Sequence, residues 1–226
     1  MLLPVWQVAL RLTGRAAKPP TWPARRGARR AAVAGAAAAP IRVLTRAEFR
    51  ELRTAAPYYR GREHYMAAAA TIADDLIARH HLTSALELGC HMRPIVTGAD
   101  VIEWRPPDDL RAAGRIIVHD ATAAPWPVED GAYGLFVALQ VFEHLNDGQR
   151  VAFGEVCRVA RHAIISLPID WQMSDPKNCH HMISVEKALS WFAPHVPTRI
   201  VEGNPGPKAR LIFVFENLDQ IAAATP

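Results

Sequence analysis

Short apolar runs alternate with stretches of helical periodicity from about residue 45 to the end of the chain. Five of these runs are short and nearly continuous, as expected for strands that are buried on both faces of a parallel sheet. They cover residues 85–88, 100–104, 115–119, 135–139 and 163–167. Two later runs, 198–202 and 210–215, predict a terminal hairpin.

Four helices are predicted around these strands. Thr45 and Glu48 form a capping box that begins a helix ending near residue 53. Further helices are expected at about 62–80, 147–158 and 185–192. The first two precede the first strand and are expected to cap its end. The pattern predicts an α/β fold: a Rossmann-like three-layer sandwich, with a mostly parallel sheet, a C-terminal antiparallel hairpin and an N-terminal helical cap.

Charge divides the chain into two regions. The whole chain has a formal charge of +4, yet the first 46 residues carry nine basic side chains and no acid. The other 180 residues therefore hold 17 bases and 22 acids, a net charge of −5. A nucleic-acid partner is not expected, because binding a polyanion requires clustered Lys and Arg.

Residues 1–40 form a basic leader rich in Ala, Arg and Pro, and they are predicted to be disordered. A membrane-surface or partner helix over residues 6–15 and a targeting segment are the alternatives. Residues 41–226 are predicted to form one domain. No run of 18 apolar residues exists, so no transmembrane segment is expected. Three cysteines without a short-range pairing pattern favour a reducing, cytoplasmic setting.

Sheets of this kind bind ligands at the carboxyl ends of their parallel strands. The candidate site therefore consists of the first loop, residues 89–94, and of the residues that follow the other strands. The first loop lacks the Gly-x-Gly-x-x-Gly pattern of dinucleotide sites, because His91 and Pro94 occupy the later glycine positions. Only ten residues separate Gly89 from Asp100, too few for a full crossover helix. NAD and FAD are therefore disfavoured, while an adenosine cofactor without phosphates fits.

Five segments resemble class I S-adenosylmethionine-dependent methyltransferases, small-molecule branch, in order and spacing: 86–90, 101–103, 120–127, 130–135 and 139–145. The resemblance extends from residue 86 to 168. It implies S-adenosyl-L-methionine as cofactor. It further implies contacts of the methionine part with Glu87, Gly89 and Cys90, of the ribose with Glu103, of the adenine with Asp120 and Ala121, and of the sulfonium with Gln140 and Val141. His91 and Trp104 complete the expected cofactor contacts.

Three histidines are candidates for catalysis. If the acceptor is a hydroxyl, His144, His180 or His181 is expected to act as its general base, because imidazole titrates near neutral pH. No metal is expected. Adjacent histidines on an extended segment point in opposite directions, and no local Cys-x-x-Cys or His-x-x-x-His pair accompanies Cys179.

The sequence thus predicts a methyltransferase that acts on a small molecule, with O-methylation favoured over N- or C-methylation. Its oligomeric state is left open. His91 and Gly134 depart from the usual glycine and aspartate of the resembling family. The alternative is therefore a non-catalytic relative that binds the cofactor as a partner subunit. A metal-dependent hydrolase built on residues 179–181 is a third, less favoured hypothesis.

Overall fold

The computed structural model describes residues 41–204 and 208–221. The leader predicted over residues 1–40 lies outside this range, as does the alternative helix over 6–15. Residues from Pro40 onward cluster into one compact unit. No helix among the described residues is long and apolar enough to cross a membrane.

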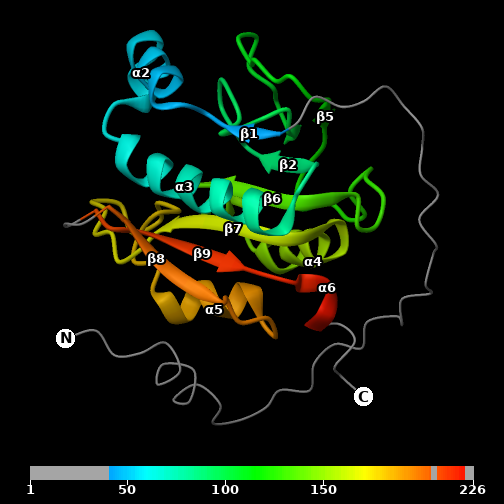
Figure 1. The fold of residues 1–226 in the computed structure, drawn as a ribbon. Coiled ribbons are helices and arrows are strands. Elements are labelled where there is room, and N and C mark those ends of the chain that lie inside the picture. The colour runs from blue at the N-terminus through cyan, green and yellow to red at the C-terminus, as the bar shows by residue number, and fades with distance from the viewer. Residues whose placement is uncertain (1–40, 205–207, 222–226) are drawn as a thin grey trace. The chain divides into compact units, whose positions relative to one another are not determined.

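A seven-stranded sheet forms the centre of this unit (Figure 1). Its strands lie in the order β5-β4-β2-β6-β7-β9-β8. The first five are parallel, and β9 pairs antiparallel with both β7 and β8. The bounds are β2 Ala85–Leu88, β4 Asp100–Glu103, β5 Ile116–Val118, β6 Tyr133–Leu139, β7 Ala160–Pro168, β8 Arg199–Asn204 and β9 Arg210–Phe215. All seven predicted strands are confirmed, and the fold is a Rossmann-like α/β sandwich.

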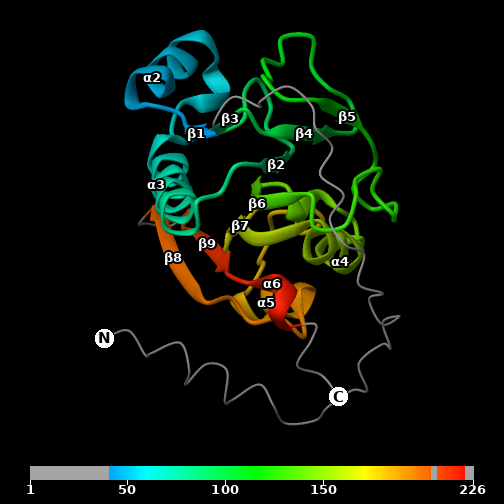
Figure 2. The same cartoon turned by 45° about the vertical axis from the view of Figure 1, so that its right-hand side comes forward.

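Helices cover both faces of the sheet (Figures 1 and 2). They are α2 Arg46–Ala55, α3 Glu63–His80, α4 Gln149–Val159, α5 Val185–Phe192 and the short α6 Leu218–Ile221. Alternate strand residues divide between two apolar clusters: Phe136 packs on the side of α4 and α5, while Leu135 and Val137 pack on the side of α3. This alternation explains why the strands read as continuous apolar runs.

The predicted capping box is present at the start of α2. Thr45 accepts from the Glu48 amide, and the Glu48 carboxylate accepts from the Thr45 amide. The same carboxylate pairs with Arg93 of the first loop at 2.6 Å. In η1 (Pro57–Tyr59), the Tyr59 hydroxyl accepts from the Met92 amide at 3.2 Å. These contacts place α2 and η1 over the end of β2, while α3 runs along the face of the sheet.

The chain between β2 and β6 contains no helix. After the first loop it forms β3, Val96–Thr97, which pairs antiparallel with β1, Arg42–Val43. This small sheet was not predicted, because two-residue strands have no periodicity to detect. The edge strand β5 remains open, with Ile116 45% and Val118 65% exposed. The connection from β2 to β4 is short and contains no helix, as predicted, and this disfavours a dinucleotide site.

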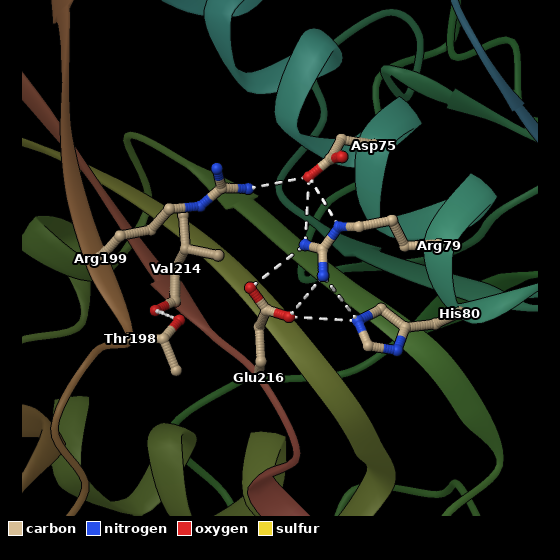
Figure 3. A network of polar contacts seen from close by, with 7 residues as sticks. All are labelled: Asp75, Arg79, His80, Thr198, Arg199, Val214 and Glu216. Atoms are coloured by element: carbon tan, nitrogen blue, oxygen red, sulfur yellow. Dashed lines mark hydrogen bonds and ion pairs between the residues drawn. The ribbon is translucent and has the colours of Figure 1, made fainter.

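A polar network joins the end of α3 to the β8–β9 hairpin (Figure 3). The Glu216 carboxylate accepts from Arg79 at 3.1 and 3.2 Å and lies 3.1 Å from His80 Nε2. Asp75 pairs with both Arg79 and Arg199. Because this cluster is partly exposed, we expect each single pair to stabilise the fold only weakly.

His162 lies beside this network and is 0% exposed. Among the described residues neither of its ring nitrogens has a hydrogen-bond partner, and its ring centre lies 4.2 Å from that of His80. Burial lowers the pKa of His162 to about 4. The charged groups and histidines that face it are His80, Arg161, Glu216 and Asp219.

We predict that His162→Leu reduces the acid sensitivity of the fold. In the unfolded chain His162 binds a proton below about pH 6.5, whereas in the folded chain it binds one only below about pH 4. His162 alone should therefore lower the free energy of unfolding of the parent protein by roughly 3 kcal/mol across this window. The difference between variant and parent in urea unfolding, measured from pH 7 to pH 4.5, should grow as pH falls. A constant difference would show that His162 does not titrate in this way.

Candidate active site

Gly89 turns the chain at the carboxyl end of β2. Its φ angle is +68°, and a Cβ atom there would lie 2.6 Å from Val141 Cγ2. The Gly89 amide donates to Ile102 O at 3.1 Å, so the turn stays attached to β4. Only glycine fits this backbone and this close approach, and the first loop is therefore pressed against the residue that follows β6.

Glu87 fixes the course of the first loop. Its side chain is buried inside the sheet, and Oε2 accepts from the Ile95 amide at 2.8 Å. Burial raises the pKa of Glu87 to about 8, against the lowering effect of the Ile95 and Val96 amides. The contact that the structure provides for Glu87 is thus with the backbone of the first loop, which it orients.

The two residues after Gly89, Cys90 and His91, lie in different surroundings. Cys90 is buried, and burial raises the pKa of its thiol. His91 has a left-handed backbone, with φ +59°, and its ring packs against Tyr58 and Tyr59 at centroid distances of 3.9 and 5.9 Å. His91 thus fills the space between the loop and η1.

Two acids lie at neighbouring strand ends: Glu103 is the last residue of β4, and Asp120 follows the end of β5 by two residues. The His119 amide donates to Glu103 O at 3.1 Å, which places Asp120 next to the end of β4. Glu103 is half-buried, and burial raises its pKa, opposed by the amides of His91 and Cys90. The adjacent Trp104 is 63% exposed.

Asp120 begins a tight turn. Its Oδ1 accepts from the Thr122 amide at 2.9 Å and from the Thr122 hydroxyl at 2.8 Å. These bonds lower the pKa of Asp120, so it is ionised at neutral pH. Ala121 is buried, and its carbonyl accepts from Trp126 Nε1 at 3.1 Å. The loop after β5 is therefore fixed before any ligand binds.

Gln140 is held in an unusual conformation just after β6. It is 8% exposed with φ +60°, a backbone region that non-glycine residues seldom adopt. Its amide donates to Ser166 O at 3.1 Å, and Arg210 Nε donates to its Oε1 at 3.1 Å. Strained residues of this kind gather at ligand sites.

Arg210 and Trp171 are neighbours of the site that the sequence reasoning missed. The Arg210 guanidinium lies 4.7 Å from the ring centres of both Tyr65 and Trp171. A pocket lined by Asp170, Trp171, Gln172 and Lys208 opens here. A charge at the start of the otherwise apolar run 210–215 was the available signal for Arg210.

The residues after Gln140 continue into η2, Phe142–His144. Glu143 is buried, and neither carboxylate oxygen has a hydrogen-bond partner within residues 41–204 and 208–221. Burial raises its pKa to about 8. The exposed His144 places Nδ1 3.2 Å from Cys179 Sγ, in the segment after β7.

The predicted catalytic histidines separate into two groups. His180 Nδ1 lies 3.7 Å from Cys179 Sγ, and the His144 and His180 ring centres are 4.9 Å apart. His181 instead accepts from the Met173 amide through Nδ1 at 3.1 Å. The structure thus brings His144 and His180 together and directs His181 into its own loop.

Gly134 lies far from these residues. It is near the start of β6, at the opposite end of this strand from Gln140. Its amide donates to Ser84, which precedes β2, and a Cβ atom at Gly134 would lie 3.1 Å from Leu82 Cδ2. Close packing there explains a small residue. The position therefore bears on the packing of β6 and not on the ligand end of the sheet.

No protein-family model matches the chain. No curated protein sequence matches it either. Among solved structures, similar ones include the N-methyltransferase NodS from Bradyrhizobium japonicum WM9 in complex with S-adenosyl-L-homocysteine. The identity is 16%, with 71% of this chain and 88% of NodS covered and a TM-score of 0.49.

Two other similar structures are the bifunctional kinase-methyltransferase WbdD and the N-terminal domain of EvdMO1. WbdD is 16% identical over 63% of this chain and 37% of its own, with a TM-score of 0.46. The EvdMO1 domain, determined in the presence of S-adenosyl-L-homocysteine and D-fucose, is 12% identical over 68% of this chain and 82% of its own, with a TM-score of 0.45. The function proposed below therefore rests on the residues of this chain.

Proposed function

We propose that the protein is an S-adenosyl-L-methionine-dependent methyltransferase. One observation carries the proposal: Gly89, Glu103 and Asp120 stand at the ends of three neighbouring parallel strands, next to the point where the strand order reverses between β2 and β6. Carboxylates suit a ribose diol and an adenine amino group. The first loop leads into β3, so no helix N-terminus follows it to receive a pyrophosphate.

In this proposal the cofactor extends along the carboxyl edge of the sheet. Glu103 and Trp104 receive the ribose, Asp120 and Ala121 the adenine, and the turn at Gly89 the methionine part. Gln140 and Val141 lie beside the sulfonium. The enzyme's task is then to hold a nucleophile in line with the methyl group and to exclude water.

We further propose a small-molecule acceptor, with transfer to oxygen. The pocket beside Trp171 combines an aromatic ring with the polar side chains of Asp170, Gln172 and Lys208. A hydroxyl acceptor must lose a proton, and His144 and His180 are the imidazoles that the structure brings together nearby. The acidic balance of residues 47–226 argues against a nucleic-acid acceptor. We also propose a cytoplasmic location, because the three cysteines show no short-range pattern for disulfide pairing.

A transfer assay tests this proposal. The full chain would be incubated with methyl-labelled S-adenosyl-L-methionine and a panel of hydroxylated small molecules, each paired with its amine analogue. We expect label in a hydroxyl acceptor and an equal amount of S-adenosyl-L-homocysteine. Cofactor binding without transfer to any acceptor would favour the partner-subunit alternative, and transfer only to the amines would exclude O-methylation.

A further inference from the structure

Three metal-ligating side chains from two distant segments meet at the carboxyl edge of the sheet. His144 ends η2 after β6, whereas Cys179 and His180 follow β7. Cys179 Sγ lies 3.2 Å from His144 Nδ1 and 3.7 Å from His180 Nδ1. One ligating atom of each residue lies within 4.8 Å of the others. The sequence expectation against a metal considered only local pairs and did not foresee that His144 joins this segment.

These spacings fit a tetrahedral ion. Zinc binds sulfur at about 2.3 Å and imidazole nitrogen at about 2.0–2.1 Å, which puts the two ligand atoms about 3.5 Å apart across a tetrahedral centre. The two sulfur–nitrogen distances here bracket that value. Asn178 Oδ1 accepts a hydrogen bond from His180 Nδ1 at 2.9 Å, and a metal bound at this nitrogen would replace that proton. One thiolate with two imidazoles is a donor set suited to zinc.

Glu143 provides a second, independent observation. Its side chain is 0% exposed, and neither oxygen has a hydrogen-bond partner in the part of the chain that the structure describes. A buried carboxyl group without hydrogen bonds is costly, and a bound cation would add to the favourable charges of Arg62 and Arg210 that already act on it. Its Oε1 faces His180 Nε2 at 3.7 Å, the nitrogen opposite the one that faces Cys179. At 3.7 Å the two atoms are not hydrogen-bonded, but a carboxylate in this place fixes the tautomer and orientation of a ligating ring once the ring nitrogen approaches to hydrogen-bond distance.

A second group of possible ligands, His80, His162 and Glu216, does not share these features. The Glu216 carboxylate is already bound by the Arg79 guanidinium at 3.1 and 3.2 Å (Figure 3). A cation there would have to displace Arg79. In contrast, among the described residues no arginine or lysine is bonded to the Glu143 carboxyl group, so the cluster at Cys179 is the better metal site.

We infer that His144, Cys179 and His180 bind one divalent transition-metal ion, with Zn²⁺ the best match, and that Glu143 supports His180 from behind. His144 is exposed and Cys179 half-buried, so an ion can enter from solvent. Three protein ligands leave a fourth position open, as in catalytic zinc sites. The two histidines then hold the ion instead of acting as bases, and His181 stays outside the site.

The role of this ion in methyl transfer rests on the proposed function, whereas its binding does not. An acceptor hydroxyl in the fourth position would be acidified and would lose its proton to solvent. Its oxygen forms a bond to the methyl carbon as the carbon–sulfur bond breaks, which leaves neutral S-adenosyl-L-homocysteine. This arrangement favours acceptors that present a hydroxyl beside the pocket at Trp171.

Metal titration of the full chain tests the inference. The protein, freed of metal by dialysis against a chelator, would be titrated with Co²⁺ and then with Zn²⁺. We expect one Co²⁺ per chain, an intense thiolate-to-cobalt charge-transfer absorption, and displacement by Zn²⁺. Cys179→Ser should remove the charge-transfer absorption, and His144→Ala should weaken binding at least tenfold. Glu143→Gln should keep the absorption but weaken binding by about 10- to 100-fold.

Two matched variants serve as controls. Cys157→Ser and His181→Asn change the same residue types outside the site and should leave Co²⁺ binding unchanged. Absence of the absorption in the parent protein, or its survival in Cys179→Ser, would overturn the inference. Titration of the same samples with S-adenosyl-L-homocysteine separates the two proposals: cofactor binding without metal binding removes the metal site alone, and metal binding without cofactor binding removes the methyl-transfer role.

Discussion

Glu103→Ala is expected to weaken binding of S-adenosyl-L-methionine roughly a hundredfold. The carboxylate at the end of β4 is the proposed acceptor for both ribose hydroxyls, and hydrogen bonds to charged groups contribute about 1.5–3 kcal/mol each. Partial exposure of the side chain reduces their sum. Isothermal titration calorimetry of parent and variant measures the difference directly.

The neighbouring amides require a second variant. The amides of Cys90 and His91 lie close to the Glu103 carboxyl, so Glu103→Ala also changes the first loop. Glu103→Gln keeps an acceptor in that place and should lose only about tenfold in affinity. Glu202→Ala, an exposed acid on the far edge strand β8, should bind like the parent. Equal affinities of Glu103→Ala and parent would remove Glu103 from the cofactor site.

Gly89→Ala is expected to lower the free energy of unfolding by about 2–4 kcal/mol, because it adds a clash to an unfavourable backbone conformation. The added Cβ would lie 2.6 Å from Val141 Cγ2 at a φ of +68°. The double variant Gly89→Ala with Val141→Ala should recover the part that comes from the clash. Urea unfolding of the single and double variants checks this.

Gly61 provides the matched control. Its φ is +74°, yet no atom of the described residues lies within 4 Å of a Cβ atom there. Gly61→Ala should therefore cost about 1 kcal/mol, the conformational part alone. If Gly89→Ala costs no more than Gly61→Ala, the first loop is not held against Val141 as described.

The strands were predictable because their buried residues form nearly continuous apolar runs in the sequence. In α5, Val185–Phe192, the predicted and observed bounds agree, since Ser184 accepts from the Lys187 amide and fixes the start. Strand ends were less certain: β7 begins at Ala160, three residues before the predicted run, because pairing with β6 extends through Tyr133. Hydrogen bonding, unlike burial, leaves little trace in the composition of a strand.

The strand-end residues of the site were predictable from topology alone, since parallel strands bring their carboxyl ends to one edge. The groups that surround them were not. Gln140 and Arg210 are 70 positions apart, and His144 and Cys179 are 35 apart, so their contacts depend on how β7, β9 and the segment after β7 pack. His91, likewise, is placed by its left-handed backbone and by Tyr58, which sequence spacing does not reveal.

Calorimetric titration of the full chain with S-adenosyl-L-homocysteine tests the central claim most directly, because binding of this product requires no acceptor. We expect one binding site per chain, with affinity weakened in Glu103→Ala and in Asp120→Ala and unchanged in Glu202→Ala. No binding to the parent protein, with either S-adenosyl-L-homocysteine or S-adenosyl-L-methionine, would contradict the assignment of this sheet edge as a cofactor site and with it the proposed methyl transfer.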